Sequence, residues 1–296
     1  MIDFLKYRIA CAVYSICLIA AFVGAYVYKT NTRGEAFTYS IDFTGGTQVL
    51  LKFDKPISSA QLKKVVEDAG WHGAVTRDFS SQEVLIRVKE VVSDAKGLGE
   101  RIRAAVESAM PGVKVNMEGT ESVGAGVGSA LRYNSAKAIV IGLILMLLYI
   151  AIRFWSFALA FGAVVALFHD SIVMLAVFLF LDKEISVAVI GAILAVLGYS
   201  INDTIVIFAQ IRDNIKKMPG VPLYDIVNTS INQTLRRTIL LSFSTALTVL
   251  SMFVFGGEIL RDFSLCLLVG IVFGTYSSIY IASPVMMLFY KEPQTK

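Results

Sequence analysis

The sequence predicts a polytopic α-helical membrane protein that carries one small α+β domain. Of its 296 residues, 56% are apolar and only 17% are charged. Mean hydropathy is +0.67. The apolar residues are gathered into long runs, except at residues 29–132, where the composition is that of an ordinary soluble domain. This composition and arrangement are typical of chains that cross a membrane several times.

Charge and cysteine usage exclude several classes of function. The formal net charge of +4 comes largely from short basic segments, so nucleic acid is not expected as a partner. Cys11, Cys17 and Cys266 lie in apolar runs without a His or Cys at metal-ligand spacing, so we expect core residues, no metal and no disulfide framework. The sequence contains no P-loop, which argues against nucleotide hydrolysis. We expect no cofactor and no enzymatic activity.

The first apolar run, residues 9–28, contains no charged residue and follows Lys6 and Arg8. A cleaved signal peptide is the alternative interpretation, but its apolar region would be only about 7–15 residues long. We therefore expect residues 1–28 to form a cytoplasmic N-terminus and an uncleaved transmembrane helix.

Residues 29–132 are expected to form an independent domain outside the cytoplasm. Strands and amphipathic helices follow one another in the order β-α-β-β-α-β, the pattern of a ferredoxin-like fold. Strands are expected at 47–53, 74–79, 83–88 and 113–117, with helices at 58–69 and 94–110. Gly124, Gly126 and Gly128 follow and predict a flexible linker before the next span. A phosphate-binding loop is the alternative, but the segment lacks a Gly-Lys-Ser/Thr ending.

Residues 133–296 contain five further apolar runs, so six spans are expected in all. Their approximate positions are 134–152, 154–181, 185–211, 238–257 and 263–290. With the N-terminus inside, most basic residues of the short segments fall in the cytoplasm, as the positive-inside rule requires. These residues are Lys6, Arg8, Arg153, Arg212, Lys216, Lys217, Arg236, Arg237, Lys291 and Lys296. Both termini are therefore predicted to be cytoplasmic.

The run at 185–211 carries Asn202 and Asp203 side by side in an otherwise apolar stretch. An ionisable residue at the centre of a span costs roughly 2.5–3.5 kcal/mol to insert, which packing alone does not justify. Asp203 lies eight residues before Ile211, about 12 Å deep at 1.5 Å per residue. We interpret Asp203 as a carboxyl that binds and releases protons, with Asn202 beside it.

Arg237 enters the next span from the same side of the membrane. Its long side chain can reach inward toward the level of Asp203 while its stem stays in apolar surroundings. A carboxyl whose proton affinity depends on the distance to an arginine is a usable proton carrier. The alternative is that Arg237 is an anchor at the membrane surface, facing water.

Other polar groups in the spans also have structural alternatives. His169 and Asp170 are interpreted first as a polar pair that holds helices together, and second as participants in proton transfer. Thr204 and Thr238 are further candidates for polar support of the pathway. The hydroxyl residues of the fifth span and the GxxxG at 270–274 are typical of close helix packing.

Several motifs resemble the SecF proteins of the SecD/SecF family, which belongs to the resistance-nodulation-division superfamily. They are IDFTGGT at 41–47, His-Asp in the third span, GYSINDTIVIF at 198–208, Arg-Arg-Thr at 236–238 and GTYSSIYIASP at 274–284. They follow one another in the family's order over essentially the whole chain. The resemblance implies six spans with one periplasmic domain after the first.

The resemblance also implies a multi-pass subunit of the bacterial inner membrane that works with SecD, the SecYEG translocon and a YajC-like accessory subunit. Such a subunit uses the proton-motive force to draw secreted precursor proteins outward in late export, after the ATPase SecA has pushed them in. A fourth-span Asp and a fifth-span Arg carry protons in the family, and they match Asp203 and Arg237. The family often continues F-D-R-I-R-E-N, whereas this chain has Ala209 and Gln210 in place of the first charged pair.

Three other functions remain open from the sequence. A proton-coupled small-molecule exporter of the same superfamily would need about twice as many spans. An intramembrane aspartyl protease with Asp170 and Asp203 as its dyad would carry G-x-G-D around the second Asp, which is missing. A purely structural subunit would keep its activity when Asp203 is neutralised.

Overall fold

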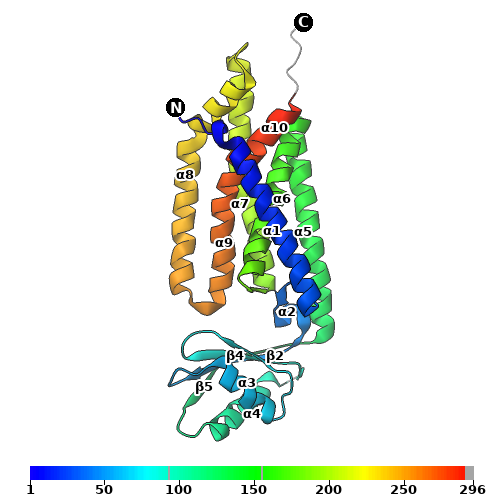
Figure 1. Ribbon diagram of the computed structural model, residues 1–296, viewed down its shortest axis with the longest axis vertical. Helices are drawn as coiled ribbons and strands as arrows, with labels where there is room; N and C mark the ends of the chain where they lie inside the picture. Colours follow the sequence, from blue (N-terminus) through cyan, green and yellow to red (C-terminus); the bar gives the residue numbers. More distant parts are fainter. Residues whose placement is uncertain (93, 155, 291–296) are drawn as a thin grey trace. The chain divides into compact units, whose positions relative to one another are not determined.

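The computed structural model describes residues 1–92, 94–154 and 156–290 of the chain. Its contacts divide into two compact units, one formed by Tyr39–Ala136 and the other by Met1–Thr38 with Lys137–Lys296. The first unit contains the four-stranded β-sheet and the second contains most of the long helices (Figure 1). Lys291 and Lys296, counted above among the cytoplasmic basic residues, lie outside the described residues.

The sheet unit has the predicted ferredoxin-like topology. Its strands are β2 (Gly46–Phe53), β3 (Val75–Asp78), β4 (Glu83–Val88) and β5 (Val115–Val123). They lie in the order β3-β4-β2-β5 with every neighbouring pair antiparallel. The helices α3 (Ser59–Asp68) and α4 (Ala95–Ala109) complete the β-α-β-β-α-β order, so the predicted fold class is confirmed.

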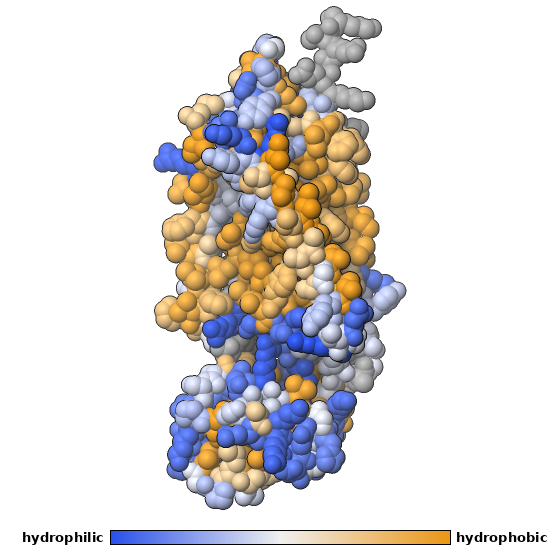
Figure 2. All heavy atoms as spheres, in the orientation of Figure 1, coloured by the Kyte–Doolittle hydropathy of each residue, from blue (hydrophilic) through white to orange (hydrophobic). Residues whose placement is uncertain are grey.

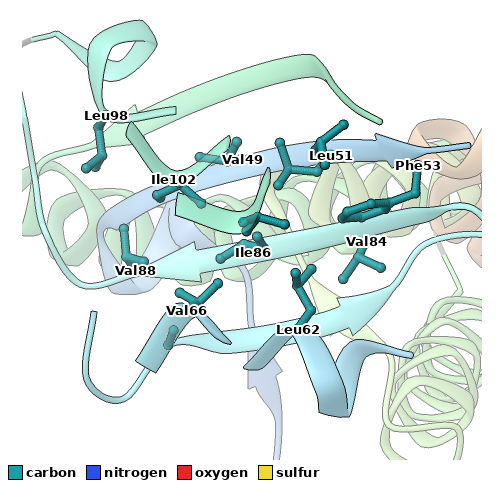
Figure 3. Close-up of a cluster of buried hydrophobic side chains, with 13 residues drawn as sticks. Val49, Leu51, Phe53, Leu62, Val66, Val84, Ile86, Val88, Leu98 and Ile102 are labelled. Atoms are coloured by element: carbon teal, nitrogen blue, oxygen red, sulfur yellow. The ribbon is translucent and has the colours of Figure 1, made fainter. Parts of the chain in front are cut away.

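Alternate residues of the strands and the inner faces of the two helices form the core of this unit. Figure 3 shows Val49 and Ile86 of the central strands with Leu62 of α3 and Ile102 of α4, and all four are fully buried. Each helix begins at a polar cap, because the side chains of Ser58 and Asp94 accept backbone N–H groups from the first turn. Burial of these apolar faces holds the unit together.

Truncation of a core valine is expected to destabilise the sheet unit. Val84 on β4 is fully buried, so Val84→Ala should cost about 1.5–3 kcal/mol of unfolding free energy. The same change at Val75, which is 54% exposed on β3, should cost well under 1 kcal/mol. Proteolysis within residues 39–136, followed against denaturant in the full chain, measures both variants. Equal susceptibility of the two would contradict the core described here.

The glycine-rich segment is helical, in contrast to the flexible linker predicted above. β5 ends at Val123, and α5 (Ala125–Phe154) begins two residues later, so Gly128 lies in its first turn. A Cβ at position 128 would lie 3.0 Å from the amide nitrogen of Gly45 and 3.1 Å from the carbonyl oxygen of Phe43. Glycine therefore permits close packing on the IDFTGGT turn, and composition alone does not distinguish this use from flexibility.

Six helices of the described chain are long and apolar enough to cross a membrane. They are α1 (Arg8–Arg33), α5, α6 (Phe157–Phe180), α7 (Val187–Lys217), α8 (Leu223–Phe255) and a last span of α9 (Gly257–Ser277), η2 (Ser278–Ala282) and α10 (Ser283–Phe289). The shorter elements are η1 (Leu5–Tyr7), α2 (Ile41–Thr44), β1 (Thr38–Tyr39) and β6 (Glu184–Ile185). The chain is therefore a multi-pass membrane protein.

The helices differ in how much of their surface is buried by the chain itself. α6, α7 and the last span form the packed centre, whereas α1, α5 and α8 bury little of their surface. Apolar residues cover the outer face of the helices visible in Figure 2. This is the surface expected for helices that face lipid or a partner in the membrane.

The connection between α7 and α8 is shorter than predicted. The sequence suggested that the fourth span ends near Ile211 and the fifth begins near Thr238, with cytoplasmic residues between them. Instead, α7 continues to Lys217, and α8 begins at Leu223. Between these helices, helix-breaking Pro and Gly occur only at residues 218–222. The polar residues on either side are compatible with a helix that extends beyond the lipid, so both helices continue up to this short segment.

The N-terminal segment is tied to the start of α8. The amide nitrogens of Ile2 and Phe4 donate to the side-chain oxygens of Asn232 and Asn228, at 2.9 and 3.0 Å. Both asparagine amides donate back to the carbonyl oxygen of Ile2. Leu5 is buried beyond this contact. Four hydrogen bonds between backbone atoms of the N-terminus and asparagine side chains therefore hold α8, the helix of Arg237, to the start of the chain.

Asp182, in the turn after α6, joins α6 to the end of α1. Its Oδ1 accepts hydrogen bonds from Lys29 Nζ at 2.6 Å and Arg33 Nη1 at 3.0 Å. The hydrogen bond from Lys29 is the main cause that holds the pKa of Asp182 below its ordinary value, and Arg33 adds to it. Because the folded pKa is lowered, the pairs stabilise the fold above an Asp pKa of about 3.9 and lose this effect at lower pH.

We expect Asp182→Asn to lower stability only slightly at neutral pH, by no more than about 1 kcal/mol, because the carboxylate side chain is 47% exposed. Wild type and variant should converge in strongly acidic buffer, where the wild-type carboxyl is protonated as well. Thermal unfolding in detergent at the two pH values measures the difference. A difference that grows on acidification would contradict the assignment.

Candidate functional site

Asp203 lies in the middle of α7, where three helices meet. The apolar residues of this segment form a long helix. Ser186 caps its start, because its side chain accepts the N–H of Val189. Asp203 is only 5% exposed. Its Oδ2 faces Ser242 Oγ of α8 and Thr275 Oγ1 of α9, each at 3.4 Å, and these two hydroxyls bond to one another at 2.8 Å.

Asp203 is therefore a buried carboxyl with weak partners. Hydrogen bonds between oxygens are typically 2.5–3.0 Å long, so both contacts at 3.4 Å are poor. No Lys or Arg of the described chain forms an ion pair with it. A carboxyl in this setting can change its protonation state without breaking a strong hydrogen bond. That property suits a proton carrier better than a packing residue.

Arg237 lies further along its helix than the sequence suggested. It stands in the middle of α8, not at the start of a helix, and its side chain is exposed. Thr238, the next residue, faces inward with 2% exposure, and its Oγ1 is a buried atom without a hydrogen-bond partner in the described chain. Thr238 lies one turn before Ser242, so α8 brings an unused hydroxyl close to the Asp203 site.

The two neighbours of Asp203 on α7 point in different directions. Asn202 is exposed on the outer surface of the helix, away from the hydroxyl cluster. Thr204 is buried, and its Oγ1 bonds to Ser278 Oγ at 2.8 Å. Thr204 therefore ties α7 to the last span, as expected for polar support, whereas Asn202 faces whatever surrounds the helix.

His169 and Asp170 form a second buried polar cluster, on α6. Asp170 is fully buried, and its Oδ2 accepts hydrogen bonds from Ser200 at 2.6 Å and Ser277 at 2.9 Å. Its Oδ1 lies 3.3 Å from Nδ1 of His169. The cluster joins α6, α7 and α9. Asp170 and Asp203 have separate partners, which does not favour a shared-proton protease dyad.

The last span changes its helical form beside these clusters. The residues Ser278–Ala282 are π-helical, and the side chain of Ser283 donates to the carbonyl oxygen of Ser278 at 2.9 Å. Pro284 has no backbone N–H, which disturbs the α-helical hydrogen bonds at this point. Such π segments are frequent at functional sites, because they rotate side chains out of the regular helical register.

The departure at Ala209 and Gln210 lies in a polar contact between α7 and α8. The side-chain amide of Gln210 donates to Gln233 at 2.8 Å, and the amide of Asn214 donates to Gln233 and to Ser230 at the same distance. Neutral side chains thus join the two helices at this point. The contact holds α8 beside α7 at the Lys217 end of the helix.

Sequence reasoning missed several residues that contact the two carboxyls. Ser200, Thr275 and Ser277 donate to Asp170 or Asp203, yet no pattern assigned them to a site. For Thr275 and Ser277, the available signal was the density of hydroxyls in GTYSSIYIASP, inside an otherwise apolar span. Across the described ranges, no group of three His, Cys, Asp or Glu side chains is placed to hold a metal ion.

The fold and the site define a membrane protein with six candidate spans, a ferredoxin-like domain and two carboxyls buried at helix contacts. Residues 103–292 match the family described as "Protein export membrane protein SecD/SecF, C-terminal", and residues 36–57 match the "SecD/SecF GG Motif". The chain belongs to the SecD/SecF family.

Individual relatives agree with this assignment. The chain is 39% identical to a protein translocase subunit SecF of Vibrio alginolyticus, over 95% of this chain and 88% of the relative. It is 36% identical to a SecF of Thermodesulfovibrio yellowstonii, over 100% and 97%. A crystal structure of SecDF, a translocon-associated membrane protein from Thermus thermophilus, superposes with a TM-score of 0.86 at 34% identity. That match covers 97% of this chain but only 38% of the SecDF chain.

Proposed function

We propose that this chain is a SecF-like subunit of the Sec protein translocase, which uses the proton-motive force with SecD to promote late export through SecYEG. The observation that carries the proposal is Asp203, a buried carboxyl in a membrane span whose hydroxyl contacts to Ser242 and Thr275 are both long. Relatives named as translocase subunits support the same function and give no support to a small-molecule exporter. They also give no support to an enzyme.

The proposed location is the bacterial inner membrane, with both termini in the cytoplasm and residues 29–132 in the periplasm. The support is the distribution of basic residues, which favours the cytoplasm for Lys6, Arg8, Arg153 and the end of α7 at Lys216 and Lys217. In this orientation, α7 runs from its periplasmic start at Val187 to its cytoplasmic end at Lys217.

SecD is the proposed partner at the exposed face of α7 and α8. Asn202 and Arg237 are polar and exposed on helices long enough to span the membrane, a position that is costly against lipid. The Thermus thermophilus relative is a SecDF chain of which this chain matches 36%, so a SecD-like portion accompanies the matched region there. SecYEG, a YajC-like subunit and secreted precursors are further proposed partners.

In the proposed mechanism, Asp203 takes a proton from the periplasmic side and releases it toward the cytoplasm when Arg237 approaches. One charge that crosses 100 mV supplies about 2.3 kcal/mol, enough to shift an equilibrium between two helix arrangements. Only Gly124 stands between β5 and α5, so the motion would reach the periplasmic domain through this helix, without a flexible linker.

The proposal is tested by export of a precursor into inverted membrane vesicles that lack this chain but contain SecD. Adding back the chain should restore the component of export that depends on the proton gradient. ATP-driven insertion by SecA should be the same with and without it. If the gradient stimulates export equally without the chain, the proposed function is wrong.

A further inference from the structure

His169 has one nitrogen atom that the described chain leaves without a partner. The residue is 3% exposed, at the middle of α6. Its Nδ1 faces Oδ1 of Asp170 at 3.3 Å, while Nε2 is buried and makes no hydrogen bond to any described residue. A buried polar atom without a partner is costly, so its presence in a span calls for a ligand.

The surroundings of Asp170 favour the tautomer of His169 that carries its hydrogen on Nδ1. Both hydroxyls that contact Asp170, from Ser200 and Ser277, donate to Oδ2. Oδ1 is therefore left to accept the Nδ1–H of His169, as when a carboxylate fixes the tautomer of a histidine. Nε2 is then left with a lone pair that can accept a hydrogen bond or a proton. Water would serve as this ligand, because it can donate a hydrogen bond to Nε2 and deliver a proton.

We propose that His169 is a second proton-binding residue of the helix bundle, which takes up a proton at Nε2 from a buried water. Asp170 is its positioning residue, held by the two serines. One proton moves in each step: a hydrated proton binds Nε2 and gives an imidazolium beside the Asp170 carboxylate. The same proton leaves from Nε2 to water and then to the Asp203 carboxylate.

The two clusters share α7 and α9, and this shared support is the basis of the proposed transfer. Ser200 and Asp203 are one turn apart on α7, about 4.5 Å along the axis. Thr275 and Ser277 stand two residues apart on α9, one facing each carboxyl. In the orientation proposed above, Ser200 lies on the periplasmic side of Asp203, so His169 would receive the proton first.

The side chains packed around His169 are tyrosines, and none of them is placed to take up the proton in its stead. Tyr276 of α9 has its ring centroid 6.0 Å from that of His169, and its hydroxyl donates to the carbonyl oxygen of Cys11 on α1. Tyr276 also bonds to Ser15 at 3.1 Å, so its hydroxyl is already engaged. Tyr280 of η2 and Tyr14 of α1 pack on Tyr276. No Lys or Arg of the described chain contacts Asp170, so an imidazolium at 169 would be its cation.

Nitrogen NMR of the full chain in lipid vesicles with SecD tests the proposal directly. The chain contains only two histidines, His169 and the exposed His72, so labelling its imidazoles with ¹⁵N gives two sets of signals. The variant His72→Gln removes one set. We expect His169 to carry its hydrogen on Nδ1 at alkaline pH and to become an imidazolium on acidification. A neutral His169 at every pH at which the gradient drives export would overturn the proposal, as would a hydrogen on Nε2.

Two serine variants separate a proton-binding role from packing. Ser200→Ala removes a donor from Asp170 and should shift the pH midpoint of the His169 signals. Ser171→Ala, one residue beyond Asp170, removes a buried hydroxyl that bonds only within its own helix, and it should leave the midpoint unchanged. Equal effects of the two variants would assign the cluster to packing and overturn the proposal.

The functional readout compares His169→Gln with His72→Gln, the same change at the exposed histidine. The inference rests on the proposed function, so wild-type export must first respond to the gradient. His169→Gln should then lose the gradient-dependent component, while His72→Gln keeps it. If wild-type export ignores the gradient, the proposed function fails, whatever the NMR shows. If both variants respond like wild type, the function stands and the inference fails.

Discussion

Replacing Asp203 with asparagine is expected to abolish the gradient-dependent component of export and to leave ATP-driven insertion unchanged. Asparagine has nearly the same size and its side-chain oxygen can accept the long contacts from Ser242 and Thr275, so the helices should pack as before. It cannot take up a proton between about pH 4 and 9, so a charge can no longer be carried at this position. The gradient-dependent component should be lost completely, because the proposed mechanism couples export to the proton that Asp203 binds.

The matched control is Asp213→Asn, the same change on the same helix. Asp213 is exposed near the end of α7, with no place in the buried cluster. We expect this variant to export at the wild-type rate with and without the gradient. Export is measured with a precursor in inverted vesicles, at equal amounts of folded chain. If Asp203→Asn also retains the full response to the gradient, Asp203 is structural and the coupling must lie elsewhere.

Sequence patterns predicted the architecture well because each pattern reports a strong physical effect. Long uncharged runs predict the membrane spans, because a charged side chain in lipid is costly. Alternation of apolar and polar residues in the strands, together with two amphipathic helices, predicts the ferredoxin-like fold. The strand order β3-β4-β2-β5 confirms it. Asp203 stood out for the same reason as the spans, because it is a charge in an apolar run.

The patterns failed where the outcome depends on contacts between helices. The apolar runs of α8 and α9 contain several Ser and Thr residues, and the sequence does not show which of them contact Asp203. Only the packing of the helices brings Ser242 and Thr275 to it. Arg237 was placed at a helix start because the sequence shows where lipid ends but not where the helix ends. Gly128 was assigned to a flexible linker, but it lies in a helix, where the absence of a side chain lets the turn at Phe43 and Gly45 pack against it.

Leucine at position 274 is expected to separate α7 from α9 and to unfold the helical unit at lower temperature. A Cβ there would lie 2.9 Å from Cβ and 3.1 Å from Oγ of Ser200, and 3.4 Å from its Cα. These atoms belong to a buried stem with no freedom to turn away, so the helix itself must move. Overpacking of this kind typically costs about 1–3 kcal/mol, and the GxxxG at 270–274 packs against Val196 and Ser200 of α7.

The same change at Gly191 is the matched control, because it also places leucine on a membrane helix. Gly191 is exposed on α7, and a Cβ there meets no atom within 4 Å. We expect Gly191→Leu to unfold at the wild-type temperature and Gly274→Leu several degrees below it, both measured in detergent. Because Ser200 also donates to Asp170, Gly274→Leu should disturb the His169 signals as well. If the two variants are equally stable, the close approach of α7 and α9 does not hold the polar clusters in place.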